Sequence, residues 1–249
     1  MEATAMVREG GVWDEQHSVG KTIALHLVPG ALITAFYAVA APVVRGFGFP
    51  SLMAIFLAII FVLIPFELGY LFYAARRNGT SLGGAVRYRE PVSRWQFVAL
   101  VVSLFVWAGI GTGLAVPLED AIREDVFSFL PGWFLLQEDF SGYSTAALAI
   151  TLVLGVIVNG IAAPITEELY FRGYLLPRIS RFGAWAPLMN MVLFSLYHFF
   201  TPWQNVGRII GLLPMVYAVW WKRSIYISMA VHVLGNLLSM AILAVVFFG

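Results

Sequence analysis

Three short patterns in the last third of the chain combine acids with imidazoles and could activate water. The acids lie in PITEELYFRGYLLPR (164–178), one histidine in FSLYHFF (194–200) and another in HVLGN (232–236). The side chains concerned are Glu167, Glu168, Arg172, His198, His232 and Asn236. A carboxylate and an imidazole beside one water can take its proton. A second imidazole and an amide N–H can donate to the oxygen that becomes negative when that water attacks a carbonyl. The set therefore suits hydrolysis of an amide bond without a covalent intermediate.

The two adjacent acids have different expected partners. Glu168 and Arg172 are four residues apart with the acid first, which is the favourable order for an ion pair on a helix. Glu167 lies about 100° around the helix from Glu168, so Arg172 cannot serve both acids equally. We therefore expect Glu168 and Arg172 to neutralise each other and Glu167 to be the acid available for chemistry.

The same acid and two histidines would also suit zinc. A Glu/His/His set can hold the ion, which lowers the pKa of its bound water. The ligands would be Glu167, His198 and His232. The residues alone do not decide between a site without a cofactor and a zinc site, and both stay open here.

The composition places these patterns in a membrane. The 249 residues are 60% hydrophobic and 12% charged, whereas soluble domains have roughly 45–50% and 25%. In a bilayer an ionisable side chain costs about 2.5–3.5 kcal/mol at the centre of a helix, so the few buried acids and histidines are the informative residues. Counted from the expected cytoplasmic ends, Glu167 lies about 15–20 Å deep, His198 about 20 Å and His232 about 12 Å. The three side chains can meet in one buried layer.

We expect an all-α polytopic bundle of about seven transmembrane helices of about 20 residues each. The apolar stretches cover 22–44, 48–75, 95–118, 144–166, 184–202, 207–221 and 224–248. An eighth helix is allowed, because 144–180 is too long for one span. No linker or repeat divides the chain, so residues 1–249 are expected to form one integral membrane domain, with the motifs within 164–240.

The basic residues set the expected orientation. They gather between the second and third spans, whereas the loop 119–143 holds one basic residue beside six acids. The gathered residues are Arg76, Arg77, Arg87, Arg89 and Arg94. We therefore predict a protein of a bacterial cytoplasmic membrane, with its N-terminus in the cytoplasm and its site opening toward that side. A net charge of +1 offers no basic face, so nucleic acid is not an expected partner.

Other protease mechanisms lack their residues. There is no cysteine, no H-E-x-x-H and no G-x-S-x-G. All four aspartates lie in expected tails or loops: Asp14, Asp120, Asp125 and Asp139. Thiol, serine-elbow, aspartyl and zincin-type mechanisms are therefore disfavoured.

Taken in order, the three patterns resemble the motifs of the CAAX-prenyl-protease and bacteriocin-processing family, also called the Abi family. The matching patterns are Glu167-Glu168-x-x-x-Arg172, Phe194-x-x-x-His198 and His232-x-x-x-Asn236, with Phe171-Arg172-Gly173 similar as well. The resemblance implies an intramembrane endopeptidase related to the type II enzymes that cut three residues from prenylated CAAX peptides. Its substrate would be a peptide or protein, prenylated or not.

The resemblance also implies a role for each residue of the site. Glu167 and His198 would activate the water, and His232 and Asn236 would form the oxyanion site. Glu168 and Arg172 would hold the geometry, in agreement with their expected ion pair.

Two other functions stay as alternatives. A non-catalytic scaffold or regulator of a partner protein could keep the polar cluster for helix packing. A proton-coupled transporter could use the buried acids, but no pair of broken helices recurs in matching halves. Glu67, in the second span, is expected to serve packing near Arg76 and Arg77.

Overall fold

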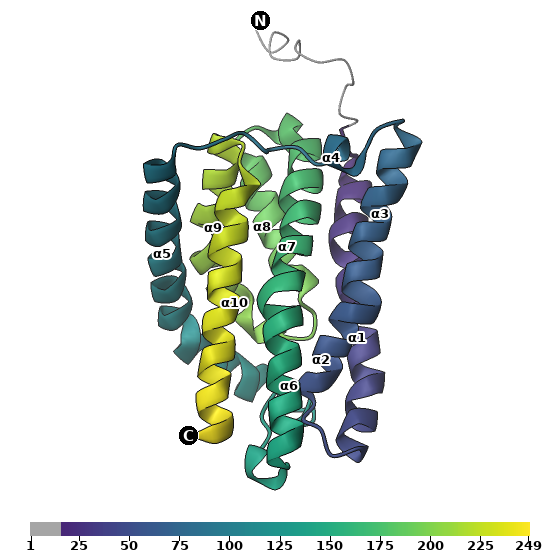
Figure 1. The fold of residues 1–249 in the computed structure, drawn as a ribbon, viewed down its shortest axis with the longest axis vertical. Coiled ribbons are helices and arrows are strands. Elements are labelled where there is room, and N and C mark those ends of the chain that lie inside the picture. The colour runs from purple at the N-terminus through teal and green to yellow at the C-terminus, as the bar shows by residue number, and fades with distance from the viewer. Residues whose placement is uncertain (1–15) are drawn as a thin grey trace, which may run out of the picture.

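A computed structural model describes residues 16–249 as a bundle of helices whose axes run in nearly the same direction (Figure 1). Within this range the only strand-like feature is an isolated bridge between Arg89 and Ser224. The predicted all-α transmembrane fold is therefore confirmed.

Each predicted span corresponds to a helical segment. In chain order these segments are α1 (Val19–Gly46), α2 and α3 (Leu52–Ala58 and Ile64–Arg77), α5 (Arg94–Ala121), α6 and α7 (Thr145–Ile157 and Ala163–Glu167), α8 (Trp185–Tyr197), α9 (Asn205–Lys222) and α10 (Ile225–Phe248). The short helix α4 (Leu82–Ala85) lies between α3 and α5. The stretch for which two helices were allowed is one continuous helix from Thr145 to Phe182.

Five helical segments of the described chain are long and apolar enough to cross a bilayer: Val19–Gly46, Leu52–Arg77, Arg94–Asp125, Thr145–Phe182 and Ile225–Phe248. Helix α8 has only 13 residues, and the 18-residue α9 carries Arg208 and Lys222. A span needs about 20 apolar residues, so these two helices do not qualify by length and composition. The protein is an integral membrane protein, and the count of seven spans stays a prediction.

Two of the long helices together contain three wide π turns that are each followed by a proline within two residues. The turns are η1 (Ile59–Leu63), η4 (Val158–Ala162) and η5 (Glu168–Leu175), and the prolines are Pro65, Pro164 and Pro177. Proline has no N–H and its ring clashes with the carbonyl four residues earlier, so the α-helical ladder must adjust beside it. Two of these irregular turns flank the paired glutamates.

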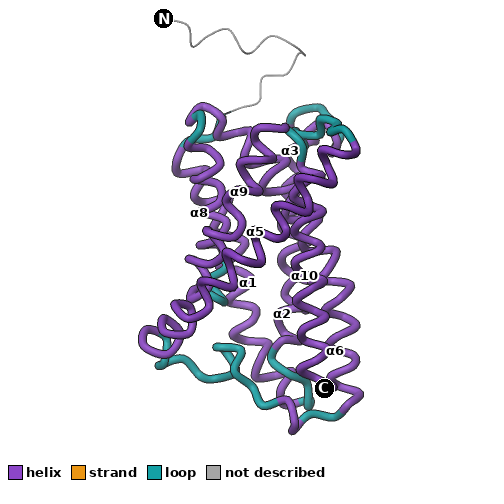
Figure 2. The backbone as a smooth tube through the Cα atoms, turned by 90° about the vertical axis from the view of Figure 1, so that its left-hand side faces the viewer, coloured by secondary structure: helices purple, strands orange, loops and turns teal. Residues whose placement is uncertain are grey.

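Helix α8 ends inside the bundle. The sequence predicts a span over 184–202, but the helix stops at Tyr197, and residues 198–204 form a loop before α9. Figure 2 shows this loop partway along the bundle, away from the loops at both ends. Backbone at membrane depth must find its hydrogen bonds within the protein. The loop does so through hydrogen bonds with Arg208, which is why the predicted helix can end there.

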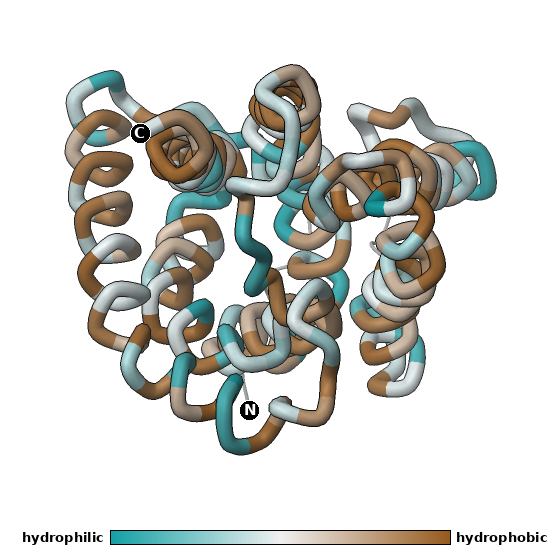
Figure 3. Tube along the Cα trace, turned by 90° about the horizontal axis from the view of Figure 1, so that it is seen from below, coloured by the Kyte–Doolittle hydropathy of each residue, from teal (hydrophilic) through white to brown (hydrophobic). Residues whose placement is uncertain are grey.

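The outside of the bundle is apolar, and its interior holds ionisable groups. Hydrophobic residues recur on helices all around the molecule when it is seen from below (Figure 3). Leu114 and Val39 are among the large side chains that face outward. Glu67, Glu168 and Arg172 are instead completely buried. This inversion of the pattern in soluble proteins is expected when the surrounding solvent is lipid.

The basic residues that the sequence places in cytoplasmic loops gather at one end of the bundle. The chain between α4 and α5 crosses this end (Figure 1) and bonds to the start of α10. The Glu90 N–H donates to the Arg223 carbonyl at 2.9 Å, and the Ile225 N–H donates to the Tyr88 carbonyl at 2.7 Å. Arg87, Arg89 and Arg223 therefore share one end.

Candidate active site

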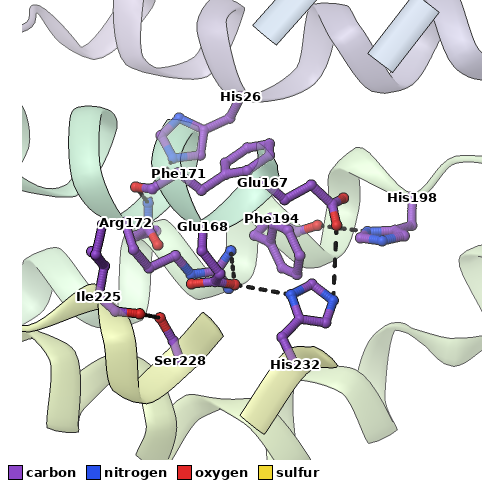
Figure 4. Close-up of polar contacts among 11 residues, drawn as sticks. His26, Glu167, Glu168, Phe171, Arg172, Phe194, His198, Ile225, Ser228 and His232 are labelled. Carbon is purple, nitrogen blue, oxygen red and sulfur yellow. Dashed lines mark hydrogen bonds and ion pairs between the residues drawn. The ribbon is translucent and has the colours of Figure 1, made fainter. Parts of the chain in front are cut away.

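The two adjacent acids lie at the junction of α7 and the π turn η5. Glu167 is the last residue of α7 and Glu168 is the first of η5. Both side chains are buried. Because they are neighbours on a helix, they point in different directions and meet different partners, as their spacing predicts (Figure 4).

Glu168 joins a buried ion pair and a histidine. Its Oε1 lies 3.4 Å from Nη1 of Arg172 and 3.0 Å from Nδ1 of His232. A carboxylate can only accept, so Nδ1 of His232 carries the proton in this contact. The Arg172 guanidinium also lies 3.8 Å from the centre of the Phe194 ring, a cation–π contact that accommodates its charge away from water.

Glu167 faces the two histidines of the motifs. Its Oε2 lies 3.8 Å from Nε2 of His232, a gap that a small shift or one bridging water would close. In Figure 4 its carboxylate also points toward the ring of His198. The buried hydroxyl of Tyr197 lies next to this carboxylate, without a hydrogen bond of ordinary geometry to any described group. The acid that the sequence left for chemistry therefore points toward both imidazoles.

His198 is oriented by the backbone of its own helix. Its Nδ1 lies 2.9 Å from the carbonyl oxygen of Phe194 (Figure 4). A carbonyl only accepts, so Nδ1 carries the proton, and in the neutral ring Nε2 keeps a free lone pair. Phe194 therefore contacts residues of two motifs. Its ring contacts Arg172, and its carbonyl fixes the tautomer of His198.

Asn236 lies one turn beyond His232 on α10, and its amide ties α10 to the long helix. Its Nδ2 donates to the carbonyl of Asn159 at 2.8 Å, within the π turn η4. An amide has two N–H donors, so one remains for another acceptor. In this structure Asn236 contacts none of Glu167, His198 or His232 by a hydrogen bond.

A second polar cluster supports the site from behind. Nδ2 of the buried Asn190, on α8, donates to the Phe171 carbonyl at 3.0 Å and lies 3.1 Å from Nε2 of His26 on α1. Nδ1 of His26 contacts the carbonyl of Thr22 at 2.7 Å. Three helical segments are thereby fixed around the residues that follow the paired acids. No role could be predicted for His26 or Asn190, because a lone polar residue in an apolar helix does not reveal its partner.

The sequence predicts that Glu67 lies near the end of its span, close to Arg76 and Arg77, and this prediction is wrong. Glu67 is 10 residues, or about 15 Å, before the end of its segment at Arg77. It is completely buried, and neither carboxylate oxygen has a hydrogen-bond partner among the described residues. Helix α3 packs against α7 and η5, and Glu67 lies within electrostatic range of Glu167 and Arg172. The signal available in the sequence was its depth within an otherwise uncharged stretch.

The arrangement does not provide a metal site in this form. Among residues 16–249, no three histidine, aspartate or glutamate side chains are grouped so that they could hold one ion. The same holds for the predicted zinc ligands, which are Glu167, His198 and His232.

Comparison with protein-family models finds a match over residues 149–238, to the type II CAAX prenyl endopeptidase Rce1-like family. The matched segment contains all three motifs and runs from α6 into α10. The predicted resemblance is thereby confirmed. Comparisons with curated proteins and with solved structures each found no match.

Proposed function

We propose, from the premise that residues 149–238 match the Rce1-like type II CAAX prenyl endopeptidases, that this protein hydrolyses a peptide bond within the membrane. The family indicates intramembrane endopeptidase activity. The nucleophile in our proposal is a water activated by Glu167 and His198. The observation that carries the proposal is the buried Glu167 carboxylate, whose Oε2 lies 3.8 Å from Nε2 of His232 and which points toward the ring of His198 (Figure 4).

Water activation follows from the protonation of His198. Because Nδ1 donates to the Phe194 carbonyl, Nε2 is the atom available to accept a proton from water. The Glu167 carboxylate, on the other side of that water, accepts its second hydrogen bond and stabilises the resulting imidazolium. The proton is then delivered to the leaving amine as the C–N bond breaks, since a base in the first step serves as the acid in the second.

His232 and Asn236 would stabilise the oxyanion. With Nδ1 bound to Glu168, His232 can donate from Nε2 only as an imidazolium. Asn236 would use the N–H that Asn159 leaves free. Each such donor contributes about 10²–10³-fold to the rate in other enzymes that hydrolyse peptides.

The proposed location is the cytoplasmic membrane of a bacterium, with the basic end of the bundle in the cytoplasm. Arg87, Arg89 and Arg223 share that end, and an excess of Lys and Arg marks cytoplasmic loops. We further propose a lipidated or membrane-associated peptide as substrate. A substrate of this kind reaches a buried site from the bilayer without leaving it.

Cleavage assays on purified variants test the mechanism. In detergent or liposomes, wild type is offered a CAAX-type peptide with and without a prenyl group, and products are identified by mass spectrometry. We expect Glu167→Gln and His198→Ala to lose at least about 10²-fold in kcat. Glu124→Gln makes the same change at an exposed acid and should retain full activity.

Two outcomes would overturn parts of this proposal. Full activity of Glu167→Gln would show that Glu167 is not needed to activate the water. It would favour the scaffold function, in which an amide can replace the acid in helix packing. Activity that is lost with a zinc chelator and restored by zinc would replace the metal-free mechanism with a metal-dependent one.

A further inference from the structure

The interior end of α8 leaves carbonyl groups that need donors. The last carbonyls of a helix have no partner within the helix, and at membrane depth no water is at hand to replace one. The Phe194 carbonyl accepts from the ring of His198, and the Ser195 carbonyl accepts from the His198 N–H at 3.1 Å. The residue that carries the proposed base is therefore also part of a helix cap.

Arg208, in the first turn of α9, completes this cap from across the loop. Its Nη1 donates to the Ser195 carbonyl at 3.4 Å and to Oδ1 of Asn205 at 3.2 Å. Its Nη2 donates to Oγ1 of Thr201 at 3.0 Å and to Oε1 of Gln204 at 3.2 Å. The contacts fall on both sides of His198, three residues before it and three after. One guanidinium thereby spans the whole loop.

Helix α9 is held where Arg208 can do this by close packing on α5. Gly207 and Gly211, on either side of Arg208, lie against Ala115 and Gly111. An added Cβ at Gly211 would come within 2.8 Å of Thr112 and 3.2 Å of the Ala108 carbonyl. Small residues four apart let membrane helices approach at backbone distance. The register of α9, and hence the place of Arg208, is fixed by this contact.

The charge of Arg208 is met mainly by neutral oxygens. Within residues 16–249 no carboxylate lies at ion-pair distance from it, and the nearest acids in electrostatic range are Glu119 and Glu167. A partly buried cation bound chiefly by neutral oxygens is costly in a membrane, so its retention needs a reason. Its hydrogen bonds to Ser195 and Thr201, on either side of His198, provide that reason.

We propose that Arg208 is the positioning residue for His198: by clamping the loop 198–204 it holds the imidazole in place, with Nε2 free as the base. The proposal rests on the proposed function for its catalytic consequence. Binding of a substrate carboxylate is the less favoured role, because both terminal nitrogens already donate to the loop.

Three variants separate the charge from the clamp. Arg208→Gln removes the charge, Arg208→Lys keeps it with fewer donors, and Thr201→Val removes one acceptor without changing any charge. Arg181→Gln is the control, since it makes the same charge change at an exposed position. Displacing a catalytic group by about 1 Å costs on the order of 10²-fold in rate. We expect that loss in kcat for Arg208→Gln with KM unchanged, a partial recovery in Arg208→Lys, and a smaller loss in Thr201→Val.

The split between kcat and KM separates positioning from substrate binding. Arg181→Gln should leave both kcat and KM unchanged. A rise in KM with kcat unchanged in Arg208→Gln would overturn the proposal in favour of substrate binding.

A spectroscopic measurement tests the same proposal without any substrate. Nitrogen NMR of ¹⁵N-histidine-labelled protein reports which ring nitrogen carries the proton, and His198→Asn identifies the signal. In wild type we expect Nδ1 protonated and Nε2 bare, and in Arg208→Gln a mixture of the two neutral tautomers, because the released loop no longer holds Nδ1 at the Phe194 carbonyl. An unchanged His198 signal in Arg208→Gln would overturn the positioning role. If wild type cleaves no peptide, the proposed function fails, and this measurement still decides the role of Arg208.

Discussion

His198 and His232 face Glu167 from two regions of different construction (Figure 4). His198 stands where α8 stops, in a loop held by backbone carbonyls and by Arg208. His232 stands within the uninterrupted 24-residue α10, and its ring is held by the side chain of Glu168. Both acceptors require a proton on Nδ1, but the carboxylate also carries a negative charge and the carbonyl does not. The first region leaves Nε2 of a neutral ring free to accept a proton, and the second places a ring beside two acids.

The largest expected effect compares the same substitution in both regions. An asparagine places an amide N–H near the position of Nδ1, so His198→Asn and His232→Asn can each keep that contact and lose Nε2. We expect His198→Asn to lose about 10²–10⁴-fold in kcat, as for a general base, and His232→Asn about 10²–10³-fold, as for an oxyanion donor. Peptide cleavage under saturating substrate measures both. A greater loss in His232→Asn would exchange the two roles.

The ion pair beside His232 is the next most sensitive point. In Glu168→Gln the buried Arg172 loses its countercharge, and removing one partner of a buried pair typically costs about 3–5 kcal/mol. Chemical denaturation in detergent measures the unfolding free energy. The double variant Glu168→Gln/Arg172→Met should recover most of the loss, because no uncompensated charge remains. Equal stability of the single variant and wild type would show that Phe194 and other groups suffice to stabilise the buried charge of Arg172.

The comparison also shows what the sequence could predict. Spacing alone predicted the Glu168–Arg172 pair, because residues four apart on a helix must meet. It also put the acid and both histidines at similar depth, because about 1.5 Å per residue converts position into height. Seven helical segments followed from apolar runs separated by charges. These features depend on local periodicity, which one sequence contains.

The features that the sequence did not predict depend on contacts between distant segments. The end of α8 at Tyr197 depends on Arg208, which is 11 residues later and bonds back to Ser195. The apolar run to residue 202 gave no sign of that break. The hydrogen bond from Asn236 to Asn159 joins residues 77 positions apart. Such partners are determined by how the helices pack, which the composition of the sequence does not reveal.

Asn236 provides an intermediate effect that separates tethering from catalysis. Asn236→Ala removes the hydrogen bond to the Asn159 carbonyl, and a bond of this kind contributes about 1 kcal/mol to stability. If its free N–H also serves the oxyanion, kcat falls by about 10²-fold as well. Ser239→Ala, on an exposed part of α10, is the control for both measurements. Loss of stability with kcat intact would limit Asn236 to joining α10 and η4.

The smallest expected effect comes from repeating the Glu168→Gln change at Glu67. Glu67 is equally buried but has no cation at ion-pair distance and no hydrogen-bond partner among the described residues. A buried acid without such compensation is more stable when it carries its proton, and glutamine then has the same shape and the same charge. We expect Glu67→Gln to change the unfolding free energy by less than about 0.5 kcal/mol, well below the loss in Glu168→Gln. The same denaturation assay measures both. A loss as large as that of Glu168→Gln would mean that Glu67 is ionised and helps to neutralise Arg172. The region around His232 would then contain three ionised acids instead of two.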